Sequence, residues 1–175
     1  NNFTLAMFLG LCPFMGVSAR VETALRMGLA NIFVLVLTSL SAWFLNTFVL
    51  EKVPFLRIIS FIIVVASLVQ IVEMVIKKIS PVLFRQLGIF LPLMTTNCAI
   101  FGLAIFQTNR GYGFLQGITF AVGAGLGLTL ALVLMASIRE SVEFSDVPAI
   151  AKGTGLVLII AGTLSMAFMG FAGLL

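Results

Sequence analysis

The stretch LPLMTTNCAIFG, from Leu91 to Gly102, interrupts an apolar segment with a group of polar and reactive residues: Thr95, Thr96, Asn97 and Cys98. Pro92 stands just before them. A proline inside a helix removes one backbone donor and clashes with the preceding turn, so the helix is expected to kink or break near Cys98. The stretch therefore predicts an interrupted apolar helix whose freed backbone groups need polar partners.

Composition places this break inside a membrane protein. The chain has 175 residues, of which 61% are apolar and 9% charged, whereas soluble domains are roughly 45–50% apolar and 25% charged. Its mean hydropathy is +1.24. Ten lysine and arginine residues against six acidic residues give a net charge of +4, but the basic residues stand singly or in pairs between apolar runs. They form no basic stripe of the kind that binds nucleic acid, and we interpret them as topology signals.

Six apolar segments are separated by short charged connections. A hydrocarbon core of about 30 Å needs about 20 apolar residues for each helical crossing. The sequence therefore predicts an all-α integral membrane protein with six transmembrane helices in a single domain, residues 1–175. The segments are Phe3 to Ser18, Met27 to Leu50, Phe55 to Ile76, Val82 to Phe106, Phe114 to Ile138 and Gly155 to Leu175.

The basic residues predict the orientation of these helices. If the segments cross in turn, the connections after the first, third and fifth share one side of the membrane. By the positive-inside rule this richer side is the cytoplasm, and both termini face outward. The cytoplasmic group is Arg20, Arg26, Lys77, Lys78, Arg85, Arg139 and Lys152, and the opposite group is Lys52, Arg57 and Arg110.

The first segment repeats the features of the fourth. In FLGLCPFMG, Gly10 and Pro13 flank Cys12, and both cysteines begin a Cys-x-x-x-Gly pattern. Three crossings separate the two segments, and an odd number of crossings reverses the chain direction. We therefore expect two inverted repeats, about 1–80 and 81–175, whose broken helices bring the cysteines to the bilayer centre from opposite faces.

The cysteines themselves allow two interpretations. A free cysteine often behaves as a small buried hydrophobe, whereas a metal or redox role would explain why each cysteine coincides with a helix breaker. The chain has no histidine. Two thiolates cannot complete the four-cysteine shell of an iron–sulfur cluster, so that role requires a partner with two more.

Several stretches resemble a known family over essentially the whole chain: GLCPFMGVS (Gly10 to Ser18), SPVLFRQLGIFLPLMTTNCAIFG (Ser80 to Gly102), IRE and DVP between Ile138 and Pro148, and AFMGFAGL near the C-terminus. They resemble the RnfA component of the Rnf electron-transport complex and, more distantly, the NqrE component of the sodium-pumping NADH:quinone reductase. Family members carry further apolar residues before the position of Asn1, so an incomplete first helix is expected.

The resemblance implies a protein of the bacterial cytoplasmic membrane that pairs with a homologous partner of opposite topology, RnfE, among other Rnf components. It implies a [2Fe-2S] cluster between the two, with Cys12 and Cys98 as this chain's ligands. The complex couples electron flow between reduced ferredoxin and NAD to movement of Na⁺ or H⁺. No complete active site is expected in this chain.

Three further residues are candidates for the cofactor site. Thr95, Thr96 and Asn97 could donate hydrogen bonds to cluster sulfurs and so tune the reduction potential. Alternatively, they could satisfy the backbone of the broken helix.

Charged residues elsewhere are less informative. Glu73 lies at membrane depth, which makes it an ion-pathway candidate, but Lys77 one turn later could pair with it as an ordinary helix neighbour. Arg139, Glu140, Glu143 and Asp146 are expected to form a peripheral cytoplasmic loop. Gly123 and Gly127 have the GxxxG spacing of close helix packing.

Two other functions remain open. A secondary transporter would also have inverted repeats and broken helices, with Asn97, Thr95 and Glu73 binding a solute. A scaffold without a cofactor would not need its cysteines for electron transfer.

Overall fold

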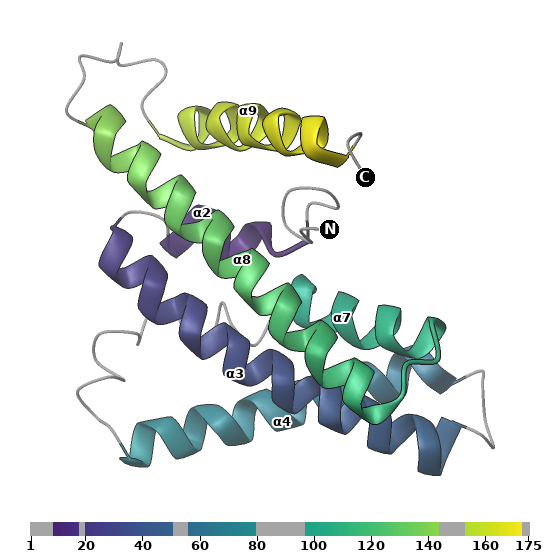
Figure 1. The fold of residues 1–175 in the computed structure, drawn as a ribbon. Helices are drawn as coiled ribbons and strands as arrows, with labels where there is room; N and C mark the ends of the chain where they lie inside the picture. The colour runs from purple at the N-terminus through teal and green to yellow at the C-terminus, as the bar shows by residue number, and fades with distance from the viewer. Residues whose placement is uncertain (1–8, 18–19, 51–55, 80–96, 144–152, 173–175) are drawn as a thin grey trace.

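The computed structural model describes residues 9–17, 20–50, 56–79, 97–143 and 153–172, which are helical apart from short turns (Figure 1). No strand occurs within these ranges. The helices, in chain order, are α2 (Leu11–Val17), α3 (Val21–Leu45) with its π-helical continuation η1 (Asn46–Leu50), α4 (Arg57–Ile79), α7 (Cys98–Asn109), α8 (Phe114–Glu143) and α9 (Thr154–Ala172).

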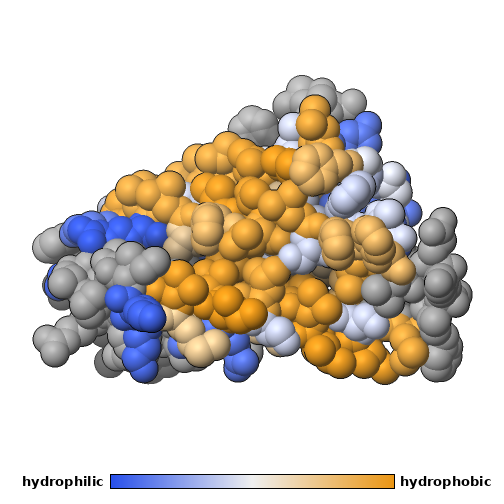
Figure 2. All heavy atoms as spheres, turned by 90° about the horizontal axis from the view of Figure 1, so that it is seen from below, coloured by the Kyte–Doolittle hydropathy of each residue, from blue (hydrophilic) through white to orange (hydrophobic). Residues whose placement is uncertain are grey.

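The described helices confirm an all-α membrane protein. Three of them are long and apolar enough to cross a bilayer, over Val21–Phe48, Ile58–Val75 and Phe114–Val142, and α7 and α9 supply shorter apolar helices. Figure 2 shows apolar side chains over most of one face, with the most hydrophilic residues toward its edges. Residues 1–8 and 80–96 of the first and fourth predicted segments lie outside the described residues. The six-helix inverted repeat therefore stays a prediction.

Two helices extend beyond their apolar segments. The second segment was predicted from Met27, but α3 begins at Val21, where Arg26 donates to Glu22 over 2.7 Å as an i,i+4 pair. Similarly, α8 continues past Ile138 to Glu143. Charged side chains at a helix end can reach the interface while the backbone stays helical. The loop predicted for Arg139, Glu140 and Glu143 is therefore wrong, because all three lie in α8. Asp146 of the same predicted loop lies outside the described residues.

Helices α3 and α8 pack closely against each other in antiparallel directions. At Gly28 and Gly125 a Cβ atom would meet Thr129 and Ile32 respectively, so each glycine lets the opposite helix approach. Within the described residues no atom lies within 4 Å of a Cβ position at Gly123, whereas the Cβ position of Gly125 faces Ile32 of α3. The contact with α3 therefore falls at Gly125, and the close packing predicted for Gly123 and Gly127 stays a prediction.

Two short helices share the core of this pair. Phe14 from α2 and Leu103 from α7 are both 0% exposed and belong to one apolar cluster with Leu128 and Leu132 of α8. Figure 1 shows that α2 and α7 both begin near the middle of the long helices and run toward opposite ends. This arrangement places the beginnings of both cysteine-bearing helices at the centre of the molecule.

Candidate metal centre

Cys12 is the second residue of a helix that starts after a sharp turn. Gly10 has φ of 88°, a left-handed value that glycine adopts without steric cost. The carbonyl of Gly10 accepts from the N–H of Phe14 over 3.3 Å, which closes the first turn. Pro13 falls within that turn, where a backbone N–H has no helical partner to lose. The structure therefore places a turn at Gly10 before α2, and Pro13 is compatible with the helix that follows.

Cys98 is the first residue of α7. Asn97 precedes it with extended backbone angles, and its Oδ1 accepts from the N–H of Ala99 over 3.0 Å. This is the N-cap interaction that asparagine favours at helix starts. The polar residue before Cys98 thus caps the start of α7.

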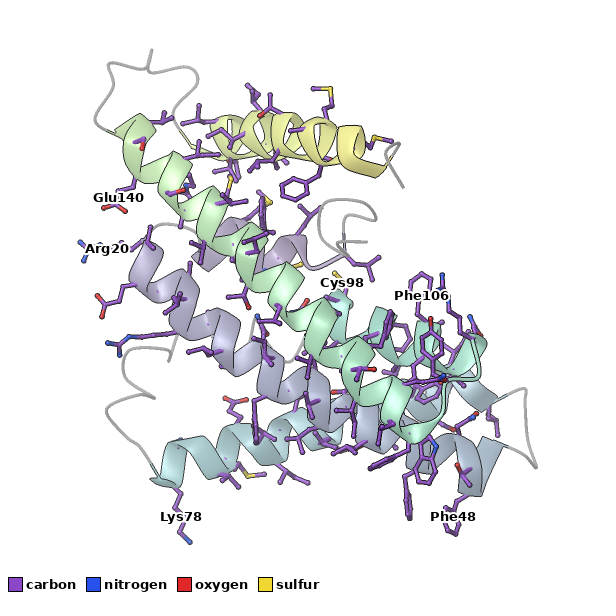
Figure 3. The ribbon with its side chains drawn as sticks, in the orientation of Figure 1. Arg20, Phe48, Lys78, Cys98, Phe106 and Glu140 are labelled. Atoms are coloured by element: carbon purple, nitrogen blue, oxygen red, sulfur yellow. The ribbon has the colours of Figure 1, made fainter. Side chains whose placement is uncertain are left out.

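The turn before Cys12 contacts the first turn of α7. The N–H of Gly10 donates to Sγ of Cys98 over 2.9 Å. A Cβ at Gly10 would lie 3.2 Å from Cβ of Ala99 and 3.4 Å from Oδ1 of Asn97. A Cβ at Gly102 would likewise meet Leu9. The backbone before Cys12 is therefore packed directly on the first turn of α7, and Figure 3 shows the central position of Cys98.

Both cysteines are free and exposed. This exposure argues against the interpretation of Cys12 and Cys98 as small core residues, because free cysteines kept for packing are usually buried. An exposed sulfur can be reached by a ligand or by a second protein. The N-terminal end of a helix such as α7 also favours a negatively charged group, since its backbone dipoles point their positive ends there.

A cationic side chain fixes the other end of α2. Nη1 of Arg139, from α8, donates to the main-chain carbonyl of Met15 over 3.3 Å. Carbonyls in the last turn of a helix lack intrahelical donors, so a guanidinium can satisfy one of them. Together with buried Phe14, this contact anchors the helix that carries Cys12. Sequence reasoning missed it because Arg139 and Met15 are 124 positions apart.

The remaining predicted residues lie in different places. Asn97 is 3% exposed; its Oδ1 caps α7, and its Nδ2 has no partner among the described residues. Thr95 and Thr96 lie outside the described residues. Glu73 is part-exposed on α4, with exposed Gln70 one turn before it. No group of three His, Cys, Asp or Glu comes together in the described part of the chain.

The fold and these contacts define a helical, multi-pass membrane protein in which the turn before Cys12 contacts Cys98 at the start of α7. Residues 1–175 match the family model described as Rnf-Nqr subunit, membrane protein. The chain therefore belongs to the Rnf-Nqr family of membrane proteins, which confirms the family expected from the sequence.

Close relatives are named as the A component of an ion-translocating oxidoreductase complex. The identity is 56% for the protein of Syntrophotalea carbinolica, 53% for that of Serratia proteamaculans and 52% for that of Escherichia coli K12. Each alignment covers 99% of this chain and 91% of the relative.

Proposed function

We propose that this chain is a membrane component of an ion-translocating oxidoreductase complex and carries electrons through a [2Fe-2S] cluster shared with a partner protein. Relatives at 52–56% identity bear the name of the A component of such a complex. The observation that carries the proposal is the exposure of both thiols where the two broken segments touch.

The sulfur donors of this chain fit half of a cluster. A [2Fe-2S] cluster takes four cysteine thiolates, and Cys12 and Cys98 are the two cysteines of this chain. A homologous membrane protein of opposite topology, RnfE, would supply the other two. A ligand shared between proteins requires surface thiols, which agrees with the exposure of both residues. When bound, the cluster supplies a one-electron relay within the hydrocarbon layer.

The neighbouring residues of the chain would hold and tune the site. The N–H of Gly10 already donates to Sγ of Cys98, and hydrogen bonds to sulfur are one determinant of cluster potential. Asn97 uses Oδ1 to fix the first turn of α7, which leaves Nδ2 as a further donor. Thr95 and Thr96 remain proposed contributors beside it.

The orientation proposed for the chain in the membrane is based on the distribution of its basic residues. Figure 3 shows Arg20, Lys78 and Glu140 at one end of the helices and Phe48 and Phe106 at the other. The first end carries most of the lysines and arginines, so it would face the cytoplasm. The chain would lie in the bacterial cytoplasmic membrane with both termini on the outer side.

Glu73 is the proposed contribution to ion movement. Its carboxylate lies late in α4, a helix whose surface is otherwise largely apolar. Ionisable residues within a span commonly mark ion pathways. In Glu73→Gln we expect less cation transport per electron, with Glu22→Gln as a control at the start of α3. Unchanged coupling would remove Glu73 from the pathway and favour the helix pair with Lys77.

Iron analysis of the purified complex tests the main proposal. Low-temperature EPR and iron content should show that Cys12→Ser and Cys98→Ser each lose the same [2Fe-2S] signal. Ala66→Ser, a similar polar change on the exposed side of α4, should retain it. Iron-free protein with solute uptake would instead support a secondary transporter. Unchanged electron transfer in both cysteine variants would support a scaffold.

A further inference from the structure

A second polar group is buried away from the cysteines, on the face of α3 that packs against α7 and α8. Its members are Asn31 and Thr38, both 0% exposed, with Ser39 at 1% and Gln107 at 3%. In the described part of the chain, five of their side-chain atoms have no hydrogen-bond partner. They are Asn31 Oδ1 and Nδ2, Thr38 Oγ1, Ser39 Oγ and Gln107 Oε1. We call these four residues the polar seam.

Helices α3, α7 and α8 meet at the Ser39 end of the polar seam. Nε2 of Gln107 donates to the main-chain carbonyl of Ser39 over 3.2 Å, so Oε1 of the same amide is directed away from that carbonyl. A Cβ at Gly117 of α8 would lie 3.1 Å from Oγ of Ser39 and 3.0 Å from Cδ of Gln107. The unpartnered Oγ of Ser39 and the side-chain amide of Gln107 therefore lie together in one small region where α8 carries no side chain.

The polar seam extends along the membrane-spanning part of α3. Asn31 and Thr38 are seven positions apart, which places them on the same helix face. At 1.5 Å per residue, the seam from Asn31 to Ser39 covers about 12 Å of a hydrocarbon core of about 30 Å. Water cannot reach such groups from the lipid, so they need partners within the protein.

The chemistry of the polar seam favours a cation. Four of its five unpartnered atoms are oxygens, two from amides and two from hydroxyls, and none belongs to an ionised group. Hard cations are bound by oxygen atoms, and divalent ions in proteins are typically bound by carboxylates. Neutral oxygens can replace the hydration shell of a monovalent cation, as rings of carbonyls do in channels.

We propose that the polar seam binds a monovalent cation within the membrane, at the end where Ser39 and Gln107 meet. The binding follows from the buried oxygens alone. The use of the bound ion as transported cargo rests on the proposed function. The seam and Glu73 would then be separate parts of one chain's contribution to ion movement.

Sodium titration of the intact complex tests this proposal. The complex is purified in choline chloride, and both ²²Na⁺ binding and Na⁺-dependent turnover are measured. We expect Ser39→Ala and Gln107→Leu each to raise the half-saturating Na⁺ concentration by about tenfold or more, since ligand count sets cation affinity. If the complex with Gln107→Leu does not assemble, the smaller Ser39→Ala substitution still tests the proposal.

Two controls separate a cation site from a general loss of polarity. Ser67 and Thr119 are exposed, and their hydroxyls donate to carbonyls of their own helices. Ser67→Ala and Thr119→Val should leave the Na⁺ dependence unchanged. EPR of the same samples should retain the [2Fe-2S] signal in the seam variants, which tests the proposed function separately. The proposal would be overturned if the wild-type complex bound no Na⁺ or if the seam variants bound Na⁺ with wild-type affinity. In either case water would be the expected partner of the seam oxygens.

Discussion

The backbone N–H of Gly10 donates to Sγ of Cys98 over 2.9 Å, although the two residues are 88 positions apart. This single contact joins the turn before Cys12 to the first residue of α7. Because the donor is a main-chain group, its position depends on the backbone at Gly10 and on the packing of α2. Substitutions at the residues that hold these two segments together should therefore disturb the candidate centre.

Alanine at Gly10 should disturb the cysteine site. Its φ of 88° and the 3.2 Å approach to Ala99 both oppose a Cβ, and strained backbone of this kind costs about 1–3 kcal/mol. We expect Gly10→Ala to lower the unfolding temperature of the complex and to reduce its iron content. Gly111→Ala is the matched control, because Gly111 also has positive φ but open space around it. It should lose stability and keep the EPR signal; equal iron loss in both variants would contradict this account.

Arg139 should position α2. Replacing Arg139 with glutamine removes the guanidinium that donates to the carbonyl of Met15. We expect a broadened EPR signal and a shifted midpoint potential, with partial rescue by Arg139→Lys. A hydrogen bond from a charged group contributes about 1.5–3 kcal/mol. Arg110→Gln is the control, because Arg110 is exposed and donates to Tyr112 at the opposite end. If Arg139→Gln lowered the unfolding temperature but left the EPR spectrum unchanged, Arg139 would have a role in stability alone.

Asn97 should have two separable roles. Asn97→Ala removes the cap of α7 and should cost about 1 kcal/mol of stability, measured by thermal unfolding of the complex. Asn97→Ser retains a capping oxygen but lacks the Nδ2 donor. If Nδ2 donates toward the cluster, redox titration should give a potential lower by roughly 40 mV, the equivalent of about 1 kcal/mol for one electron. Wild-type potential in Asn97→Ser would leave Asn97 with the capping role alone.

The α3–α8 contact should depend on Gly125. A Cβ there would lie 2.7 Å from Cγ1 and 3.2 Å from Cα of Ile32, and overpacking of this kind costs about 1–3 kcal/mol. Thermal unfolding should therefore show a loss of stability in Gly125→Ala. Gly123→Ala should be neutral or slightly stabilising, because its Cβ meets nothing within 4 Å and alanine is the better helix former. A larger loss of stability in Gly123→Ala than in Gly125→Ala would indicate that a different face of α8 packs on α3.

The sequence was sufficient for the elements that depend on local pattern. Long apolar runs predicted α3, α4 and α8, because hydrocarbon selects for such runs over the length of a crossing. Their ends were less accurate, since charged residues such as Glu22 and Glu140 continue a helix at the interface. The sequence predicted an interruption near Cys98 from Pro92 but not the N-cap role of Asn97 at the start of α7.

The contacts between segments were not predictable in the same way. The approach of Cys12 and Cys98 stays a prediction from the reversed direction of their segments, and the hydrogen bond from Gly10 to Cys98 had no signature in the sequence. Arg139 looked peripheral because its partner is a main-chain carbonyl, which has no signature in the sequence. The polar seam was missed for a similar reason: Ser39 and Gln107 are ordinary polar residues until the helices bring them together.

A cryo-EM map of the intact complex tests the central claim most directly. The account predicts density for a metal centre bound by Sγ of Cys12 and Sγ of Cys98, with two cysteine sulfurs from a homologous partner protein completing the four ligands. A map in which these two sulfurs face lipid, lie too far apart to share one cluster, or have no metal beside them would contradict it.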